Sequence, residues 1–431
     1  MADPELNIYV ITFNCARNIV NPEYLSQSFF RALPPSVLLP DIIAISLQEL
    51  SPIAYSFLGG SLITPYFDAI KKTVSLAVNR RAQEGPDFEH VLSRHVGMTG
   101  LMVFTKPGIE VKRVKTAGVG VGLWNMGNKG AVAARLTASS GSIGEMELTF
   151  VAAHLAPMEW EVKRRNRDFE NIVRNLAFRD ERLLASTGKS TEQATNSSTL
   201  AAEVDEEEPL LAKSNLQPSG LYDVTGHVFF AGDLNYRTSD VAPLLEDYER
   251  YPQPGYPPDS EKNILNFLKR DQLSRERKEG RTFHGFDEFS PIKFPPTYKY
   301  RSSSVSLDEG VEPASWPWAN HRFPSWCDRI LYLPSEAIQT HSYDILPIQS
   351  TSDHRPVALS LSVRVIARRQ LPIKAPYQLN PDFAEFRAVA RNREYVVGIL
   401  AYLGVTKEGN TVLAGVLAGL IAGWYIMQSL S

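Results

Sequence analysis

Residues 227–237 read His-Val-Phe-Phe-Ala-Gly-Asp-Leu-Asn-Tyr-Arg. The first five are mostly apolar, aromatic or β-branched and predict a short buried strand, which Gly232 is expected to end. Asp233 and Asn235 follow with one residue between them, so in extended backbone both side chains leave on the same face. A carboxylate can hold a water and a carboxamide can hydrogen-bond a phosphate oxygen. The stretch therefore indicates chemistry on phosphate, although Gly-Asp-x-Asn alone is also typical of a β-turn.

Other apolar runs that predict strands also end in polar residues: residues 6–13 before Asn14, residues 41–47 before Gln48 and Glu49, and residues 147–153 before His154. A carboxylate at the mouth of an apolar strand is placed to bind a hard divalent cation such as Mg²⁺, which prefers oxygen ligands. Each of these residues also has a plain structural interpretation, as a strand-ending Asn, a solvated Glu or a structural His. Helical spacing predicts helices over residues 65–84, 161–182, 240–250 and 263–279.

Residues 118–130 form a glycine-rich loop, Gly-Val-Gly-Val-Gly-Leu-Trp-Asn-Met-Gly-Asn-Lys-Gly. Its glycines do not follow the dinucleotide-binding spacing and no helical pattern opens after it, so a Rossmann fold is excluded. Glycine lets backbone approach a ligand closely. The loop is therefore expected to approach a phosphate.

Taken in order, these motifs resemble the inositol polyphosphate 5-phosphatases, within the superfamily of magnesium-dependent endonucleases, exonucleases and phosphatases. The resemblance covers about residues 6–365 and rests on residues 48–49, 128–130, 230–237, 295–300, 324–331 and 352–357. It implies an α+β fold: a four-layer α/β sandwich of two packed mixed β-sheets flanked by helices. It also implies one catalytic domain over residues 1–365 that uses Mg²⁺.

The resemblance assigns roles at the reacting phosphate. Glu49 is the expected principal Mg²⁺ ligand, with help from Asn14 and Asp353. The expected catalytic residues are Asp233, Asn235, His354, Asp328 and His154. A carboxylate should orient the ring of His354; the resemblance favours Asp328, but from the sequence alone Asp328 and Asp353 can be exchanged.

The resemblance also assigns residues to the inositol ring and its 4-phosphate: Asn128, Lys129, Tyr298, Lys299, Arg322 and Arg329. The chain departs from the family pattern in two places. Asn320 stands where the family commonly has a basic residue, so recognition of a 4-phosphate is expected to be weaker or shared with His321. Residues 156–160, Ala-Pro-Met-Glu-Trp, lack a histidine that the family often has, which affects the expected substrate rim.

Composition indicates which kinds of compartment and partner the protein has. The chain has 431 residues, a formal net charge of −3 and two cysteines, Cys15 and Cys327. No disulfide framework is expected, a reducing compartment is favoured, and nothing in the net charge indicates a nucleic-acid partner. The N-terminus does not resemble a secretory signal. Residues 184–219 are rich in Ser, Thr, Ala and Glu and are expected to be a disordered insertion.

Residues 366–410 predict a linker and a short helix, and residues 411–427 an uncharged transmembrane tail anchor. As a helix this anchor is ~26 Å long, closest to the endoplasmic reticulum bilayer of ~27 Å. Lys and Arg flank only its N-terminal side, which predicts a catalytic domain in the cytosol. Gly415, Gly419 and Gly423 form one stripe, interpreted equally as a homodimer face or as a glycine-rich anchor.

The expected activity is Mg²⁺-dependent hydrolysis of the 5-phosphate of phosphatidylinositol 4,5-bisphosphate to phosphatidylinositol 4-phosphate, because an anchor favours a lipid over a soluble inositol phosphate. A nuclease of the same superfamily would use the same metal and water residues, but residues 298–299, residues 326–329 and the anchor oppose it. A non-catalytic membrane tether that binds phosphoinositide would not need those metal and water residues.

Overall fold

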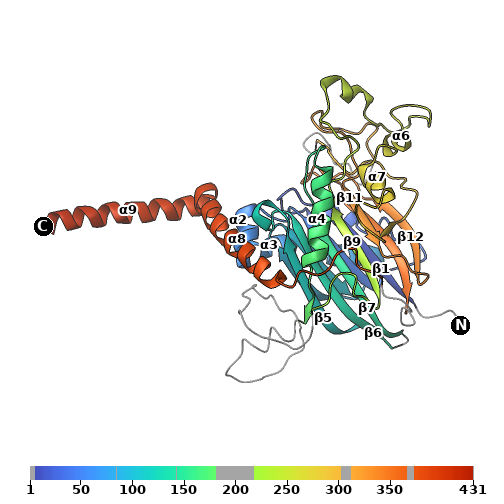
Figure 1. The fold of residues 1–431 in the computed structure, drawn as a ribbon, viewed down its shortest axis with the longest axis horizontal. Helices are drawn as coiled ribbons and strands as arrows, with labels where there is room; N and C mark the ends of the chain where they lie inside the picture. The colour runs from blue at the N-terminus through green and yellow to red at the C-terminus, as the bar shows by residue number, and fades with distance from the viewer. Residues whose placement is uncertain are drawn as a thin grey trace.

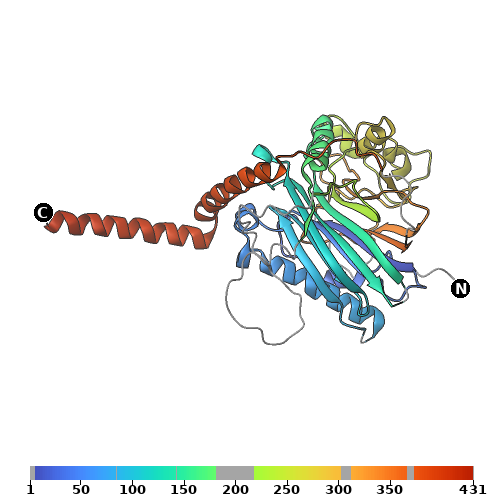
Figure 2. The ribbon, with the colours of Figure 1, turned by 60° about the horizontal axis from the view of Figure 1, so that its bottom comes forward.

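The computed structural model describes residues 5–83, 85–141, 143–180, 218–301, 312–365 and 373–430. Two β-sheets pack face to face and helices cover their outer faces, while one long helix extends away from the body (Figures 1 and 2). The four-layer α/β sandwich expected from the sequence is confirmed. Almost all of the predicted insertion at residues 184–219 lies outside the described residues, and Ser219 pairs with Phe178.

Each sheet contains one parallel pair of strands. The first sheet has the order β12 (Ile338–Ile345), β13 (Val357–Arg364), β1 (Glu5–Asn14), β2 (Ile42–Gln48), β4 (Thr99–Thr105), β3 (Glu89–Val96). The second has the order β10 (Asp287–Glu288), β11 (Asp328–Tyr332), β9 (His227–Asp233), β7 (Ile143–His154), β6 (Gly130–Ser140), β5 (Glu110–Gly120), β8 (Arg179–Asp180). Strands β1 and β2 are parallel, as are β7 and β9, so both sheets are mixed as expected.

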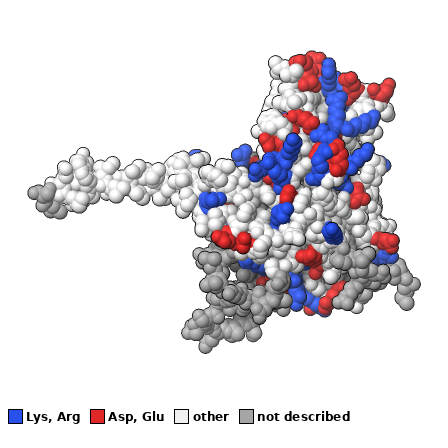
Figure 3. Space-filling view, viewed as in Figure 1, with Lys and Arg blue, Asp and Glu red and all other residues white. Residues whose placement is uncertain are grey.

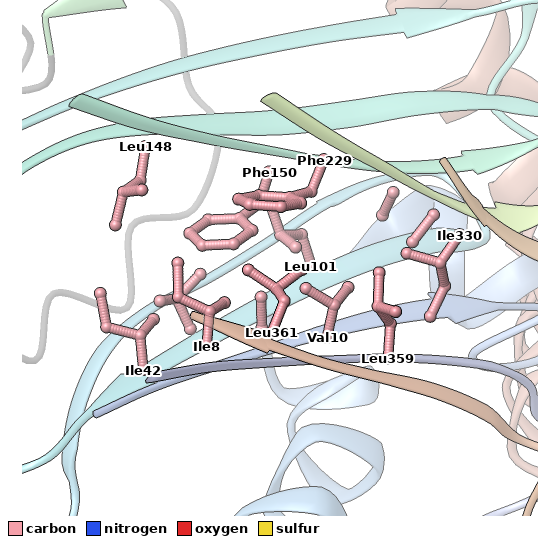
Figure 4. Packing of buried hydrophobic residues seen from close by; sticks show 14 of the residues in the cluster. Ile8, Val10, Ile42, Leu101, Leu148, Phe150, Phe229, Ile330, Leu359 and Leu361 are labelled. Carbon is pink, nitrogen blue, oxygen red and sulfur yellow. The ribbon is translucent and has the colours of Figure 1, made fainter. Parts of the chain in front are cut away.

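Both faces of the central strands are apolar because each sheet is covered on both sides. In β1, Ile8 and Val10 point between the sheets, where they meet residues such as Phe150 and Phe229 (Figure 4). The rings of Phe150 and Phe229 stack with their centroids 5.5 Å apart. Residues Tyr9, Ile11 and Phe13 of the same strand point to the helix-covered face.

Among the helices of the outer layers, α3 (Thr64–Ala82) agrees with the helix predicted over residues 65–84, whereas the helix predicted over residues 161–182 is shorter in the structure. Helices α1 (Pro22–Ser28) and α3 (Thr64–Ala82) cover the first sheet, and α4 (Val162–Asn175) covers the second. Short helices α2 (Ile53–Leu58), η1 (Gly60–Leu62) and η2 (Leu123–Asn125) lie in loops. The predicted helix over 161–182 is too long, because the chain turns after Asn175 and residues 179–180 pair with β5 as β8.

Two other predicted helices are shorter than expected. Residues 240–250 contain only the 3₁₀ helix η3 (Leu245–Arg250), and residues 263–279 divide into α6 (Ile264–Leu268) and α7 (Gln272–Lys278). Asp271 causes the division, since its side chain accepts a hydrogen bond from the backbone of Ser274 and so caps a new helix.

The expectation that Gly232 ends its strand is wrong. Strand β9 continues through Gly232 to Asp233. A Cβ at Gly232 would lie 2.0 Å from the carbonyl oxygen of Ala153 in β7, so glycine permits close approach of two strands rather than a break.

The C-terminal segment forms two helices, α8 (Phe383–Val405) and α9 (Lys407–Leu430). Helix α8 is longer than the short helix expected between 366 and 410, and it packs on α2 (Figure 1). Residues 407–429 form a candidate membrane span, in which an 18-residue stretch has a mean hydropathy of 1.6, and the span protrudes without charged side chains along most of its length (Figure 3). Helix α9 as a whole has 24 residues and is ~36 Å long at about 1.5 Å per residue, a length that includes the charged Lys407 and Glu408 before the apolar residues 411–427.

Candidate active site

The ends of strands from both sheets bring the candidate catalytic residues together. In the second sheet, Asp233 of β9 lies beside His154 of β7 and beside Asp328 of β11 in register. In the first sheet, Asn14 ends β1 and Glu49 follows β2. The Nδ2 atom of Asn14 donates to Oδ2 of Asp233 at 2.9 Å and so links the two sheets at this edge.

Asp233 is a buried carboxylate surrounded by donors. Its Oδ1 accepts from the backbone N–H of Asn235 at 3.0 Å, and its Oδ2 lies 3.2 Å from Nε2 of His154. Burial favours the neutral acid, but His354 and His154 outweigh it and hold the pKa of Asp233 below its usual range. Asp233 is therefore ionised at neutral pH and acts as an acceptor.

His154 contacts Asp233 on one side and Lys129 on the other. Burial lowers the pKa of His154, Lys129 lowers it further, and Asp233 opposes both. A neutral His154 can donate from Nε2 to Asp233 and accept at Nδ1, which lies 3.4 Å from Nζ of Lys129. Lys129 also lies 3.6 Å from Glu49, so one ammonium group serves both residues.

His354 contrasts with His154. Its Nδ1 lies 2.8 Å from Oδ2 of Asp328, and its Nε2 lies 3.8 Å from Oδ2 of Asp233. Burial alone would lower the pKa of His354, but Asp328 and Asp233 outweigh it and raise the pKa to about 9. The imidazolium form has N–H donors on both nitrogens. The site therefore holds one neutral and one protonated histidine on either side of Asp233.

Two side chains hold the carboxylate of Asp328 in place. The hydroxyl of Thr297 donates to Oδ2 of Asp328 at 2.6 Å, beside the contact with His354. Burial raises the pKa of Asp328 to about 6, and His354 opposes this shift. At neutral pH the carboxylate is still ionised and can hold the ring of His354 in one orientation. The structure thus distinguishes Asp328 from Asp353, which the sequence alone leaves interchangeable.

Asn235 has a left-handed backbone conformation with φ 57°. Its Nδ2 donates to the carbonyl of Leu155 at 3.1 Å, and its Oδ1 accepts from the guanidinium of Arg237. Since an amide nitrogen carries two hydrogens, the second N–H remains for a substrate oxygen. The extended backbone on which the same-face expectation for Asp233 and Asn235 rested does not continue past Asp233, because β9 ends there and the chain turns.

The residues expected to bind metal fit a hard divalent cation by their chemistry. Glu49 has φ 45°, and its pKa is lowered because Lys129, His154 and Arg17 outweigh the effect of burial. Its ionised carboxylate and the amide oxygen of Asn14 are oxygen donors at the ends of adjacent strands. Asp233, Asp328 and His354 also offer metal-binding atoms that all lie within 4.8 Å of one another.

Asp353 has a different partner from the one expected. Nζ of Lys299 donates a hydrogen bond to its carboxylate, beside His321 and Arg322. Arg322 lies in turn 4.0 Å from the fully buried carboxylate of Glu159. Within the described residues, neither oxygen of Glu159 has a hydrogen-bond donor. Lys299, His321 and Arg322 form a basic cluster. Two carboxylates, those of Asp353 and Glu159, lie against this cluster, and sequence reasoning did not place them there.

Arg329 and Tyr298, both expected to bind substrate, are instead buried against other protein side chains. Arg329 is fully buried and pairs with Asp271 at 3.1 Å and Glu288 at 2.6 Å. Because neighbours in a strand point to opposite faces, Arg329 faces away from Asp328 and the site does not include it. The buried ring of Tyr298 packs on His354 with centroids 4.5 Å apart, and Arg237 lies 4.4 Å above it.

Sequence reasoning missed the roles of Arg237 and Glu159. Arg237 was quoted in the opening motif, and its spacing of two residues from Asn235 is the signal for the contact found. Glu159 lies in the segment that departs from the family pattern, so the departure itself was the signal. Asn128 is half-buried, and the glycine at 122 makes room for it, since a Cβ there would lie 1.8 Å from its side-chain oxygen.

Comparisons with known proteins agree with this geometry. Residues 11–360 match Endonuclease/Exonuclease/phosphatase family 2. The phosphatidylinositol 3,4,5-trisphosphate 5-phosphatase 2B of Danio rerio is 28% identical over 303 residues, covering 67% of this chain and 20% of the relative. The type II inositol 1,4,5-trisphosphate 5-phosphatase of Mus musculus is 29% identical over 343 residues, covering 78% of this chain and 28% of the relative.

A solved structure has the same fold. The inositol polyphosphate 5-phosphatase domain of a synaptojanin, in complex with inositol 1,4-bisphosphate and calcium, superposes with a TM-score of 0.59 at 23% identity, covering 91% of this chain and 90% of that domain. The chain spans 20% and 28% of the length of these two curated relatives. The match over residues 11–360, most of the chain, shows that it belongs to endonuclease/exonuclease/phosphatase family 2.

Proposed function

We propose that the chain hydrolyses the 5-phosphate of phosphatidylinositol 4,5-bisphosphate and releases phosphatidylinositol 4-phosphate at a membrane surface. The observation that supports this most directly is the contact of two histidines with Asp233: Nε2 of His154 lies 3.2 Å and Nε2 of His354 lies 3.8 Å from its Oδ2, in a chain whose curated relatives are 5-phosphatases. The arrangement places a carboxylate that can accept a hydrogen bond from water, Asp233, beside a histidine that can donate a proton to the leaving oxygen, His354.

Asp233 orients the attacking water. Its low pKa makes it a weak base, but phosphoryl transfer has a loose transition state in which positioning counts for more than early deprotonation. The water oxygen attacks phosphorus in line with the ring oxygen, and its proton passes to the Asp233 carboxylate. The free N–H of Asn235 and the ammonium of Lys129 stabilise charge on the transferring phosphoryl oxygens.

His354 completes the reaction at the opposite end. As the bond between phosphorus and the ring oxygen breaks, Nε2–H of His354 gives its proton to that oxygen, while Asp328 stabilises the ring at Nδ1. Glu49 and Asn14 would hold a divalent cation, proposed to be Mg²⁺, which when bound neutralises charge on the phosphate. The basic cluster of Lys299, His321 and Arg322 is proposed to bind the 4-phosphate.

The membrane part of the proposal rests on α9 and the loop before β6. Helix α9 provides a candidate span, and Leu123 and Trp124, which are 63% and 61% exposed, lie in the same glycine-rich loop as Lys129. Exposed aromatic and aliphatic side chains near a site favour a lipid substrate. A tail-anchored protein of the endoplasmic reticulum with its catalytic domain in the cytosol, similar to a fungal phosphatidylinositol 4,5-bisphosphate 5-phosphatase, remains part of this proposal.

The experiment is phosphate release by the full chain in the presence of Mg²⁺. The substrates are vesicles of phosphatidylinositol 4,5-bisphosphate, vesicles of the 3,4,5-trisphosphate lipid, and soluble inositol 1,4,5-trisphosphate. We expect fastest release from the bisphosphate lipid and loss of release in Asp233→Ala. Folded protein that is silent on every inositide but cleaves duplex DNA would replace this proposal with a nuclease. Binding without release would favour a tether.

A further inference from the structure

Helix α8 contacts the glycine-rich loop, although the two are far apart in sequence. Oε1 of Glu394 accepts a hydrogen bond from the backbone N–H of Gly127 at 2.7 Å. A guanidinium nitrogen of Arg393 donates to the carbonyl of Trp124 at 3.1 Å. The helix therefore holds two backbone groups of the loop, both within five residues of Lys129.

Burial and two ion pairs hold the side chain of Glu394 in this contact. Its side chain is fully buried, and its carboxylate pairs with Arg387 at 2.8 Å and with Arg391 at 3.3 Å. Arg391 also donates to the carbonyl of Phe57 in α2 at 2.8 Å. A buried carboxylate needs such partners to offset its lost hydration. Arg387 and Arg391 supply those partners, so the Glu394 carboxylate remains in place to accept the hydrogen bond from the Gly127 N–H.

The loop needs outside support because part of its backbone is strained. Trp124 has φ 55° and Asn125 has φ 64°, a left-handed conformation that side chains other than glycine rarely adopt. Such conformations persist only where the surrounding structure fixes them. The carbonyl of Gly127 accepts from the backbone of Met98 at 2.9 Å, so this residue is held from one side by the β3–β4 turn and from the other by α8.

We propose that Glu394 is a positioning residue: through Gly127 it holds the loop so that Asn128 and Lys129 meet the substrate phosphate. This inference rests on the proposed function of the site. The two functional residues directly follow Gly127, and Nζ of Lys129 reaches both Glu49 and His154. The helix that leads into the candidate membrane span is then part of the substrate-binding apparatus rather than only a spacer.

The test compares variants of the full chain in non-ionic detergent micelles with soluble inositol 1,4,5-trisphosphate, so that docking to a bilayer does not contribute. Glu394→Ala removes the acceptor, and we expect KM to rise about tenfold with a smaller change in kcat. Glu394→Gln keeps an oxygen acceptor and should recover most of the affinity. Glu385→Gln, an exposed acid on the same helix, is the matched control and should behave as wild type.

Two further measurements separate positioning from stability. Hydrogen exchange of the Gly127 amide should become faster in Glu394→Ala while amides of β7 and β9 remain protected. If Glu394 acts through Lys129, its effect on KM should shrink in a Lys129→Ala background. If Glu394→Ala does not fold, Arg393→Ala still removes the contact to Trp124 at the surface and should raise KM about twofold to threefold.

The outcomes are distinct. An active wild-type chain whose Glu394→Ala variant keeps its KM and loses only folded protein would overturn the positioning role and leave the proposed function intact. A folded wild-type chain that releases no phosphate from any inositide contradicts the proposed function, and with it the role of Glu394 in substrate binding. A raised KM with faster Gly127 exchange supports both.

Discussion

His354 Nδ1 lies 2.8 Å from Asp328 Oδ2, whereas Asp353, its neighbour in sequence, accepts a hydrogen bond from Lys299. The two aspartates are therefore not equivalent. Asp328 orients His354, the proposed proton donor. Asp353 instead pairs with Lys299 of the basic cluster, which is proposed to bind the 4-phosphate.

Asp328→Asn should reduce kcat roughly 10²–10⁴-fold, the usual size of a general acid–base contribution, because the His354 ring loses its carboxylate partner. Asp353→Asn should instead change mainly KM, through Lys299. Steady-state kinetics on phosphatidylinositol 4,5-bisphosphate vesicles separates the two effects. Equal losses of kcat in both variants would contradict the assignment of Asp328.

Glu49→Gln should raise the Mg²⁺ concentration needed for half-maximal activity by about tenfold or more, because an ionised oxygen ligand becomes neutral. The rise in melting temperature that Mg²⁺ gives to the wild type should shrink in this variant, since only ligands that bind the folded state stabilise it. Glu246→Gln, which removes an exposed acid on η3, is the control. An unchanged Mg²⁺ dependence would remove Glu49 from the metal site.

Glu159→Gln should lower KM severalfold for substrates that carry adjacent phosphates. The buried Glu159 carboxylate lies 4.0 Å from Arg322 and offsets the charge that this arginine offers to a phosphate. The effect should be much smaller for an inositol phosphate that carries only the 5-phosphate. A rise in KM for both substrates would mean that Glu159 instead supports the loop structurally.

Arg329→Met should destabilise the fold by about 3–5 kcal/mol, because Asp271 and Glu288 would remain as buried, unpaired carboxylates. Chemical denaturation measures this loss. The KM of the protein that remains folded should equal that of the wild type, since Arg329 faces away from the site. A change in KM without loss of stability would restore Arg329 as a substrate ligand.

His90→Gln should make stability less sensitive to acid. Burial, together with Lys71, lowers the pKa of His90 from 6.5 to about 4, so between these values the unfolded chain binds a proton that the folded chain does not. His90 therefore weakens the folded state as pH falls from about 6.5 towards 4. Melting temperatures of the variant and the wild type should agree near pH 7.5 and diverge in favour of the variant near pH 5. Parallel curves would contradict the shift.

The motifs of the sequence, through their resemblance to the 5-phosphatases, were enough to predict the fold class and most of the residues that meet at the site. Apolar runs that end in Asn14, Gln48-Glu49, His154 and Asp233 are local signals, since strand propensity and an abrupt change in polarity occupy adjacent residues. Residues at the ends of neighbouring strands meet once the strands pair. The patterns alone left a plain structural interpretation open for each residue; the resemblance to the 5-phosphatases supplied the prediction that these side chains converge, and the structure brings them together.

Only the tertiary structure decided which partner each charged residue has. Asp328 and Arg329 are adjacent, but the pairing of β11 with β9 turns Asp328 to the site and Arg329 to Asp271 and Glu288. Likewise, no local pattern links Glu394 to Gly127, 267 residues apart in sequence. Ion pairs and hydrogen bonds act over a few ångströms of space, so their partners depend on strand register and helix packing, which side-chain periodicity along the chain does not encode.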